Sequence, residues 1–127
     1  MQKEQTYTIA LATRLRRRIF AAKGVAEYLI TLLTELAQSQ GWKNLTVRFY
    51  DSGVRITLTV RDDSVSVSGA NIADAIRIYT SGAIRRAFKE LWAMPSLWTK
   101  RCYVEEGAGN EETEMNIQSF FEAIPTR

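Results

Sequence analysis

The sequence predicts an α/β chain of the α+β kind, in which a ferredoxin-like split βαβ sheet carries an added C-terminal helix. Three observations support this fold class. Four stretches alternate between apolar and polar residues, as strands do, and three stretches space their apolar residues as helices do. These elements follow one another as β-α-β-β-α-β-α, and the first six are those of the split βαβ motif. The chain has 127 residues and no internal repeat, so we expect residues 1–127 to form a single domain.

A strand and a helix come first. Residues 6–12 alternate between large apolar side chains and smaller or polar ones, which predicts a strand. Residues 23–40 place a valine and four leucines at helical spacing, so they predict an amphipathic helix. Gly41 follows in the position where a glycine commonly ends a helix.

A β-hairpin is predicted next. Residues 45–50 and 54–60 both alternate, and the short segment Asp51-Ser52-Gly53 between them contains a glycine. The apolar side chains of the second strand share one face, which we expect to lie on the core. The opposite face is then open to solvent, a partner or a ligand. Because side chains alternate along each strand, that face carries Arg48, Tyr50, Arg55, Thr57 and Thr59.

A long helix, a strand and a short helix complete the order. Asn71 can cap a helix that runs to about Trp92, with basic side chains beside its apolar stripe. Residues 100–105 alternate and predict a fourth strand. Asn110 can cap a last helix over residues 111–123, whose first turn is acidic, as the helix dipole favours.

The chain contains no histidine, which excludes every active site that depends on imidazole. There is therefore no Ser-His-Asp triad and no Cys-His pair, and neither a GxxxxGK[ST] nor a GxGxxG phosphate loop occurs. Asp62-Asp63 could hold a divalent cation, but such a pair in a loop is more often simply solvated. We expect no metal and no cofactor.

The compartment is predicted from the cysteine and from hydropathy. Cys102 is the only cysteine, so no internal disulfide can form, and we expect an inert packed thiol in a reducing, cytoplasmic setting. No apolar run is long enough to span a bilayer, and the N-terminal segment lacks the order of a signal peptide. A membrane partner is not expected.

Clustered arginines predict contact with an anionic partner. The net charge is +3, and residues 14–23 hold five basic residues and no acid, whereas residues 105–114 hold five glutamates. Arginines beside an aromatic residue on a sheet face suit phosphate contacts and base stacking, although for each arginine taken alone a solvated surface position is the better reading. The candidate DNA-binding residues are Arg14, Arg16, Arg17, Arg18, Arg48, Arg55, Arg77, Arg85, Arg86 and Lys89.

The order of these segments resembles the single-tyrosine HUH transposases of the insertion-sequence 200/605 type, the IS200-like transposases. Four segments carry the resemblance, which extends from about Tyr7 to Glu122: residues 12–20 with their basic turn, 36–42 ending in Gly-Trp, 68–91 with an Arg-Arg near the end, and 97–104. The resemblance implies a ferredoxin-like fold, a homodimer and DNA as the partner.

The resemblance also implies where a catalytic site would be. The family binds a divalent metal through a His-hydrophobic-His triplet on a strand, and that triplet aligns with Gly53-Val54-Arg55. Its nucleophilic tyrosine aligns with Phe120, and a glutamine one helical turn later aligns with Ile124. None of these four positions, Gly53, Arg55, Phe120 and Ile124, has kept its chemistry, so we expect no catalytic residues.

Three hypotheses follow. The favoured one is a catalytically degenerate, transposase-like protein that binds hairpin or single-stranded DNA without strand cleavage, with Arg55 replacing the metal by direct contact with a phosphate. The alternative is a protein-interaction or dimerisation module on the same fold, in which Phe120 and Phe121 pack against a second subunit. The third is an active nuclease with a rearranged site that depends on Tyr103 or Asp63.

Overall fold

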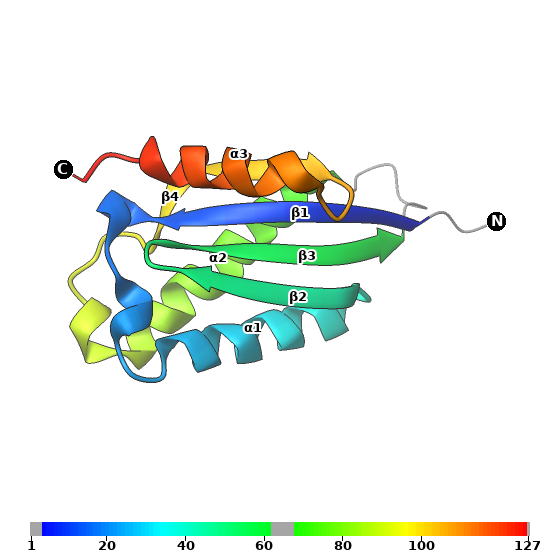
Figure 1. Cartoon of the computed structure of the whole chain (residues 1–127). Coiled ribbons are helices and arrows are strands. Elements are labelled where there is room, and N and C mark those ends of the chain that lie inside the picture. The colour runs from blue at the N-terminus through cyan, green and yellow to red at the C-terminus, as the bar shows by residue number, and fades with distance from the viewer. Residues whose placement is uncertain (1–3, 62–67, 127) are drawn as a thin grey trace.

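A four-stranded antiparallel sheet forms the centre of the molecule (Figure 1). The structure is a computed structural model, which describes residues 4–61 and 68–126. Asp62-Asp63, the candidate cation ligands, lie outside these described residues. The strands are β1 (Glu4–Thr13), β2 (Lys43–Tyr50), β3 (Gly53–Arg61) and β4 (Trp98–Glu106), in the order β2-β3-β1-β4. This order confirms the predicted ferredoxin-like fold class.

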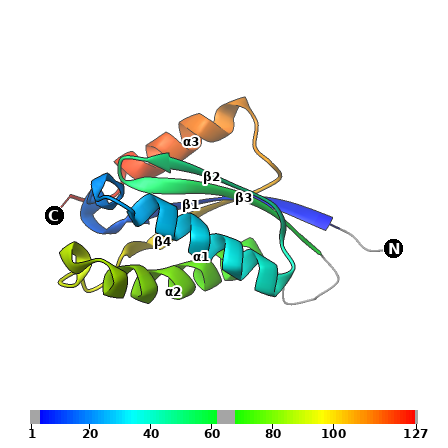
Figure 2. The same ribbon diagram turned by 90° about the horizontal axis from the view of Figure 1, so that it is seen from below.

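The helices cover both faces of this sheet. Helices α1 (Val25–Gln40) and α2 (Gly69–Ala87) lie on one face, and α3 (Glu111–Glu122) lies on the other (Figure 2). The larger core lies under α1 and α2, where Ile9, Ile56 and Ile76 are fully buried. Burial of such side chains contributes about 1.5–3 kcal/mol each, which is why the alternating and helical patterns predicted these elements.

Pairing fixes which side chains share a face of the sheet. β1 pairs with both β3 and β4, and Tyr50 lies opposite Gly53 across a two-residue turn. Arg48 lies opposite Arg55, so the predicted sharing of one face by the hairpin arginines is confirmed. This face is not open as expected, because α3 packs on it through a second apolar cluster that includes Ile117, Phe121 and Ile124.

The predicted bounds of α2 need two corrections. The cap is Ser68, whose hydroxyl accepts a hydrogen bond from the Asn71 backbone N–H at 3.1 Å, so the helix begins two residues before Asn71. The helix ends at Ala87 and not near Trp92, because Phe88 has an extended backbone and a short 3-10 turn, η3 (Lys89–Leu91), follows. The predicted cap of α3 is confirmed by a capping box between Asn110 and Thr113.

Among the described residues, no helix is long and apolar enough to cross a membrane.

Candidate nucleic-acid interface

The first position of the strand triplet is filled by an aromatic ring. Gly53 lies on β3 under α3, and a Cβ atom placed there would lie 2.6 Å from Cζ of Phe121 and 2.8 Å from the carbonyl oxygen of Leu11. The Phe121 side chain is buried against this backbone, with its ring centroid 5.0 Å from that of Tyr50. Only glycine leaves room for the ring, so no metal ligand fits at residue 53 in this arrangement.

The other triplet position, Arg55, belongs to an ion-pair cluster around Glu114. Nη1 of Arg55 lies 3.1 Å from Oε2 of Glu114, and only 18% of the Arg55 side chain is exposed. The Tyr50 hydroxyl donates to the same carboxylate at 2.8 Å, and Nε2 of Gln118 donates to it at 3.2 Å. Arg48 lies 3.5 Å from this carboxylate and over the Tyr50 ring. We call Arg48, Tyr50, Arg55, Glu114 and Gln118 the Glu114 cluster.

Ionisation within the Glu114 cluster follows from these contacts. The hydrogen bond from Tyr50 lowers the pKa of Glu114 from its ordinary value, and the nearby arginines act in the same direction. Burial, together with the Glu114 carboxylate, raises the pKa of Tyr50. Glu114 is therefore ionised near neutral pH, and Tyr50 keeps its proton. A protonated phenol that already donates to a carboxylate is a hydrogen-bond donor and a poor nucleophile.

The helix positions expected to face the triplet are displaced along α3. Phe120 does not approach Gly53 or Arg55; its ring lies against Tyr103, with centroids 6.3 Å apart. Ile124 is buried just beyond the end of the helix. The helix residue that meets Arg55 is Glu114, and Gln118 follows one turn later, which is the spacing that the resemblance gives to the tyrosine and the glutamine.

The physical reason for this displacement is the buried side of α3. Thr113, Ile117 and Phe121 point into the sheet, so Glu114 and Gln118 lie at the edge of that buried stripe. The resemblance, which places the nucleophile at Phe120, did not indicate this. The signal in the sequence was the Glu114-Gln118 pair itself, two polar residues four apart beside an apolar stripe.

These residues do not fit a divalent cation. The Arg55 guanidinium already pairs with the Glu114 carboxylate. The described residues contain no group of three or more His, Cys, Asp or Glu side chains that could bind a metal ion. Like Tyr50, Tyr103 already has a carboxylate partner, because its hydroxyl donates to Glu105 at 3.0 Å. Burial raises the pKa of Tyr103. The hydroxyls of Tyr50 and Tyr103 therefore both already donate to carboxylates, and the Glu114 cluster offers no set of metal ligands.

A second site is formed where two basic segments meet at one end of the sheet. The turn after β1 contains the 3-10 turns η1 (Arg14–Arg16) and η2 (Ile19–Ala21), and it touches the loop that leads into β4. The backbone N–H of Arg14 donates to Leu97 O at 2.9 Å, and Nη1 of Arg85 donates to Met94 O at 3.0 Å. One loop thus joins arginines that lie about seventy residues apart in the sequence.

We call this region the basic end (left in Figure 1). Its basic residues are Arg16, Arg17, Arg18, Arg86 and Lys89, of which Arg16 is half-buried and the other four are exposed. Within the described part of the chain, Arg17, Arg86 and Lys89 are exposed and make no ion pair. These side chains are therefore available to phosphates.

The other five predicted contact residues have hydrogen-bond or ion-pair partners within the chain. Arg14 and Arg85 bind the loop that joins the two segments, and Arg77 pairs with Asp74 while donating to Thr99 O. Arg48 and Arg55 belong to the Glu114 cluster. The ten predicted contacts thus divide into five whose side chains have partners elsewhere in the fold, although Arg48 among them is 64% exposed, and five that the structure brings together at the basic end: Arg16, Arg17, Arg18, Arg86 and Lys89.

The basic turn after β1 is held in an unusual conformation. Leu15 and Arg16 both have a left-handed backbone, with φ of 54° and 56°. Such conformations cost of order 1 kcal/mol or more for non-glycine residues and cluster at functional sites. The Thr13 hydroxyl fixes the turn by donating to Arg17 O at 2.7 Å, and it also lies 3.1 Å from Ser52 O.

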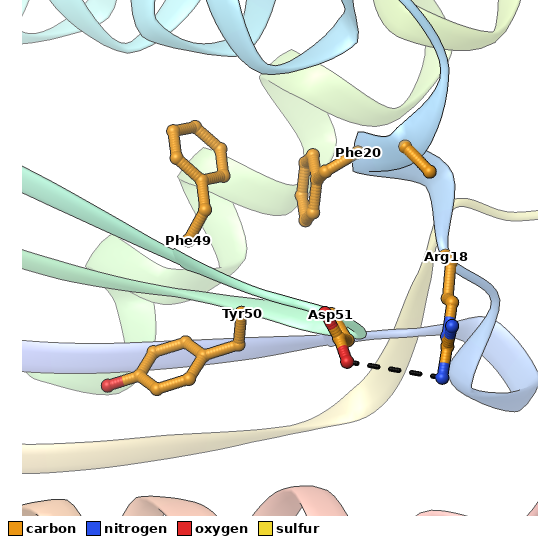
Figure 3. A pocket seen from close by; sticks show the side chains of 6 residues that line it. Arg18, Phe20, Phe49, Tyr50 and Asp51 are labelled. Carbon is orange, nitrogen blue, oxygen red and sulfur yellow. Dashed lines mark ion pairs between the residues drawn. The ribbon is translucent and has the colours of Figure 1, made fainter.

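Between the two sites lie two open pockets. One, of about 330 Å³, is lined by Arg18, Phe20, Phe49, Tyr50 and Asp51 (Figure 3). Phe20 and Phe49 meet edge to face at 4.9 Å, and Arg18 lies 4.0 Å from Asp51 across the mouth. The other pocket, of about 360 Å³, shares Tyr50 and Asp51 and extends to Arg16 and Gln118. Tyr50, a member of the Glu114 cluster, therefore lines both pockets, which also reach Arg16 and Arg18 of the basic end.

No protein-family model and no curated protein matches this sequence. Solved structures do match. The chain superposes on the crystal structure of a candidate transposase from Deinococcus radiodurans R1 with a TM-score of 0.81, at 19% identity, over 100% of this chain and 94% of that one. It superposes on a REP-associated tyrosine transposase bound to a REP hairpin with a TM-score of 0.52, at 12% identity, over 89% of this chain and 62% of that one.

The fold is that of the IS200-like transposases, as the sequence resemblance predicted. At these identities the likeness concerns the fold alone.

Proposed function

We propose that this protein is a catalytically degenerate, transposase-like DNA-binding protein that holds hairpin or single-stranded DNA at its basic end without cutting it. The observation that supports this most is the meeting of two basic segments on one loop, which leaves Arg17, Arg86 and Lys89 exposed at the same end of the sheet. Phosphate contacts of this kind supply most of the affinity of non-specific DNA binding.

Hairpin DNA is the first substrate class to test. The matching REP-associated tyrosine transposase was solved bound to a REP hairpin. In the present chain, Phe20, Phe49 and Tyr50 line the pocket of Figure 3 together with Arg18. Arginines with aromatic rings suit a backbone with unstacked bases more than a uniform duplex.

The absence of cleavage rests on the Glu114 cluster. Glu114 already neutralises Arg55, and Phe121 fills the space over Gly53, so the face that would carry the chemistry is closed by α3. The proposal therefore assigns no direct phosphate contact to Arg55, in contrast to what the sequence led us to expect. A DNA phosphate would have to displace the Glu114 carboxylate from a partner that is mostly buried.

We also propose a homodimer, formed through the β4 edge of the sheet. β4 is an outer strand of nine residues, and Val104 on it is 38% exposed. Such edges offer unpaired backbone groups to a second strand. Light scattering after size exclusion should give twice the chain mass, and Val104→Pro should shift it to the monomer; a monomeric wild-type protein would contradict this part.

The positions of Phe120 and Phe121 do not favour the alternative, a protein-interaction module. That reading needed Phe120 and Phe121 to pack against a second subunit. Phe121 is instead buried within its own chain, and Phe120 is half-buried against Tyr103.

Fluorescence anisotropy with hairpin, single-stranded and duplex oligonucleotides at low salt tests the proposal. We expect binding to the hairpin and the single strand that weakens as salt rises, with no strand cleavage on a denaturing gel in Mg²⁺ or Mn²⁺. The absence of binding to all three at low salt would overturn DNA binding. Cleavage by the wild-type protein that Tyr50→Phe or Tyr103→Phe abolishes would overturn the degenerate assignment.

A further inference from the structure

The strongest feature outside these sites is an exposed tryptophan in the loop after α2. Trp92 is 62% exposed, although its neighbours Leu91 and Met94 are both buried. Its indole N–H donates to Arg86 O at 3.1 Å, which fixes the edge of the ring while its face remains accessible. The structure thus presents a large aromatic face to solvent in a fixed position.

The ring borders an open pocket at the end of α2. This pocket has a volume of about 580 Å³ and is lined by Gly82, Arg85, Arg86 and Trp92. Its size lies within the range of small-molecule sites, which is about 300–1,000 Å³. Gly82 forms its floor without a side chain, and the guanidinium of Arg86 lies over it, since a Cβ at residue 82 would be 3.0 Å from Nη1.

The polar groups around this ring are cationic. Arg85 is held by Ser81 O, Met94 O and Pro95 O, so it forms a fixed wall of positive charge. Arg86 has no side-chain partner within the described residues, and it is exposed beside the ring. A flat aromatic face next to a free guanidinium matches an unpaired nucleobase and its phosphate, because the base stacks and the phosphate pairs with the charge.

We propose that Trp92 and Arg86 bind one unpaired nucleotide of a single-stranded segment that flanks the DNA held at the basic end. This inference rests on the proposed DNA binding, and it extends the basic end, to which Arg86 belongs, by a stacking contact at Trp92. Trp92 stacks on the base, and Arg86, whose guanidinium lies next to Gly82, contacts the adjoining phosphate.

The test compares one hairpin with and without a short single-stranded extension. For the wild-type protein, we expect the extension to tighten binding by about tenfold, as one stacked base does. An abasic residue at the stacking position of the extension should abolish most of that gain. Trp92→Ala should bind both DNAs equally while still binding the plain hairpin.

Two further variants keep the test independent of folding defects. Gly82→Leu fills the pocket without changing any charge, and leucine is a better helix former than glycine, so α2 should not be weakened. It should also abolish the gain from the extension. Trp42→Phe, a tryptophan remote from the pocket, is the matched control and should retain the gain.

The outcomes separate the two proposals. If Trp92→Ala and Gly82→Leu retain the tenfold gain, the stacking site is wrong and DNA binding stands. If the wild-type protein binds the hairpin but gains nothing from the extension, the stacking site is also wrong. If no DNA binds at all, the proposed function itself fails, and the inference fails with it.

Discussion

Replacing Gly53 with alanine tests whether the packing of Phe121 has closed the former strand site. Gly→Ala exchange in an unstrained position normally stabilises a protein by about 0.4–1 kcal/mol, because it restricts the unfolded chain. At residue 53 the new methyl group would lie 2.6 Å from Cζ of Phe121 and 2.8 Å from Leu11 O, well inside the ordinary carbon contact of about 3.5–4.0 Å. The structure therefore predicts the opposite sign.

The magnitude follows from which atoms could move. The Leu11 carbonyl belongs to β1, the strand paired on both sides at the centre of the sheet, so it cannot shift freely. The Phe121 ring is only 4% exposed and would have to leave the cluster between α3 and the sheet. Overpacking of this kind costs about 1–3 kcal/mol. We expect Gly53→Ala to lower the free energy of unfolding by that amount.

Urea denaturation followed by circular dichroism measures this change. Gly82→Ala is the matched control, because its methyl group meets only the flexible end of Arg86 within α2 and should stabilise the protein by up to about 1 kcal/mol. In a Phe121→Ala background the penalty of Gly53→Ala should shrink but not vanish, since Leu11 O remains. Unchanged or increased stability of Gly53→Ala, or an equal penalty in both backgrounds, would refute the reasoning.

Three other predictions concern α3. The pKa of Glu114 is lowered from 4.5 in the folded protein, so the stability that its carboxylate contributes is present above that pH and is lost as the pH falls below it. Urea unfolding between pH 7 and 3 should show this loss in the wild-type protein and a flatter profile in Glu114→Gln. The pKa of Tyr50 is raised above 10.0, so stability should fall as the pH rises past 10.0, and Tyr50→Phe should reduce that fall; parallel alkaline profiles would contradict the hydrogen bond to Glu114. Asn110→Ala removes the cap of α3 and should cost about 1 kcal/mol in thermal or urea unfolding, and an unchanged midpoint would mean that the cap is not formed in solution.

Patterns of short range predicted most of the fold. The alternation along β1 and the hairpin, the helix-ending Gly41 and the cap at Asn110 are all local signals, and the structure confirms them. Strand order was also predictable, because the element order β-α-β-β-α-β admits few antiparallel arrangements with short connections.

The end of α2 and the position of α3 were less predictable for reasons of tertiary packing. Leu91 is buried like a helix residue, so the apolar stripe continues past Ala87 although the backbone has already turned at Phe88. The placement of α3 over the hairpin face depends on small side chains from another strand, Ala10 and Ala12, which make room for Phe121. No periodicity within α3 itself carries that information.

Which arginines bind loops and which remain exposed was the feature least predictable from the sequence. Nothing local distinguishes Arg85, which holds a loop, from Arg86, which is exposed next to it. Only the approach of residues 94–97 to both basic segments decides it, and that approach follows from the pairing of β4 with β1. Charge clustering in the sequence therefore indicated the kind of partner, while the tertiary structure indicates which side chains could reach it.

The salt dependence of hairpin binding tests the central claim most directly. The measurement compares the wild-type protein with a triple variant, Arg17→Gln/Arg86→Gln/Lys89→Gln, and with the control Lys43→Gln, whose side chain pairs with Glu4 at the other end of the sheet. If the three exposed cations each neutralise one phosphate, the triple variant should lose about 2–3 units from the slope of log K against log salt, and Lys43→Gln should match the wild type. Equal slopes for all three proteins would contradict DNA binding at the basic end.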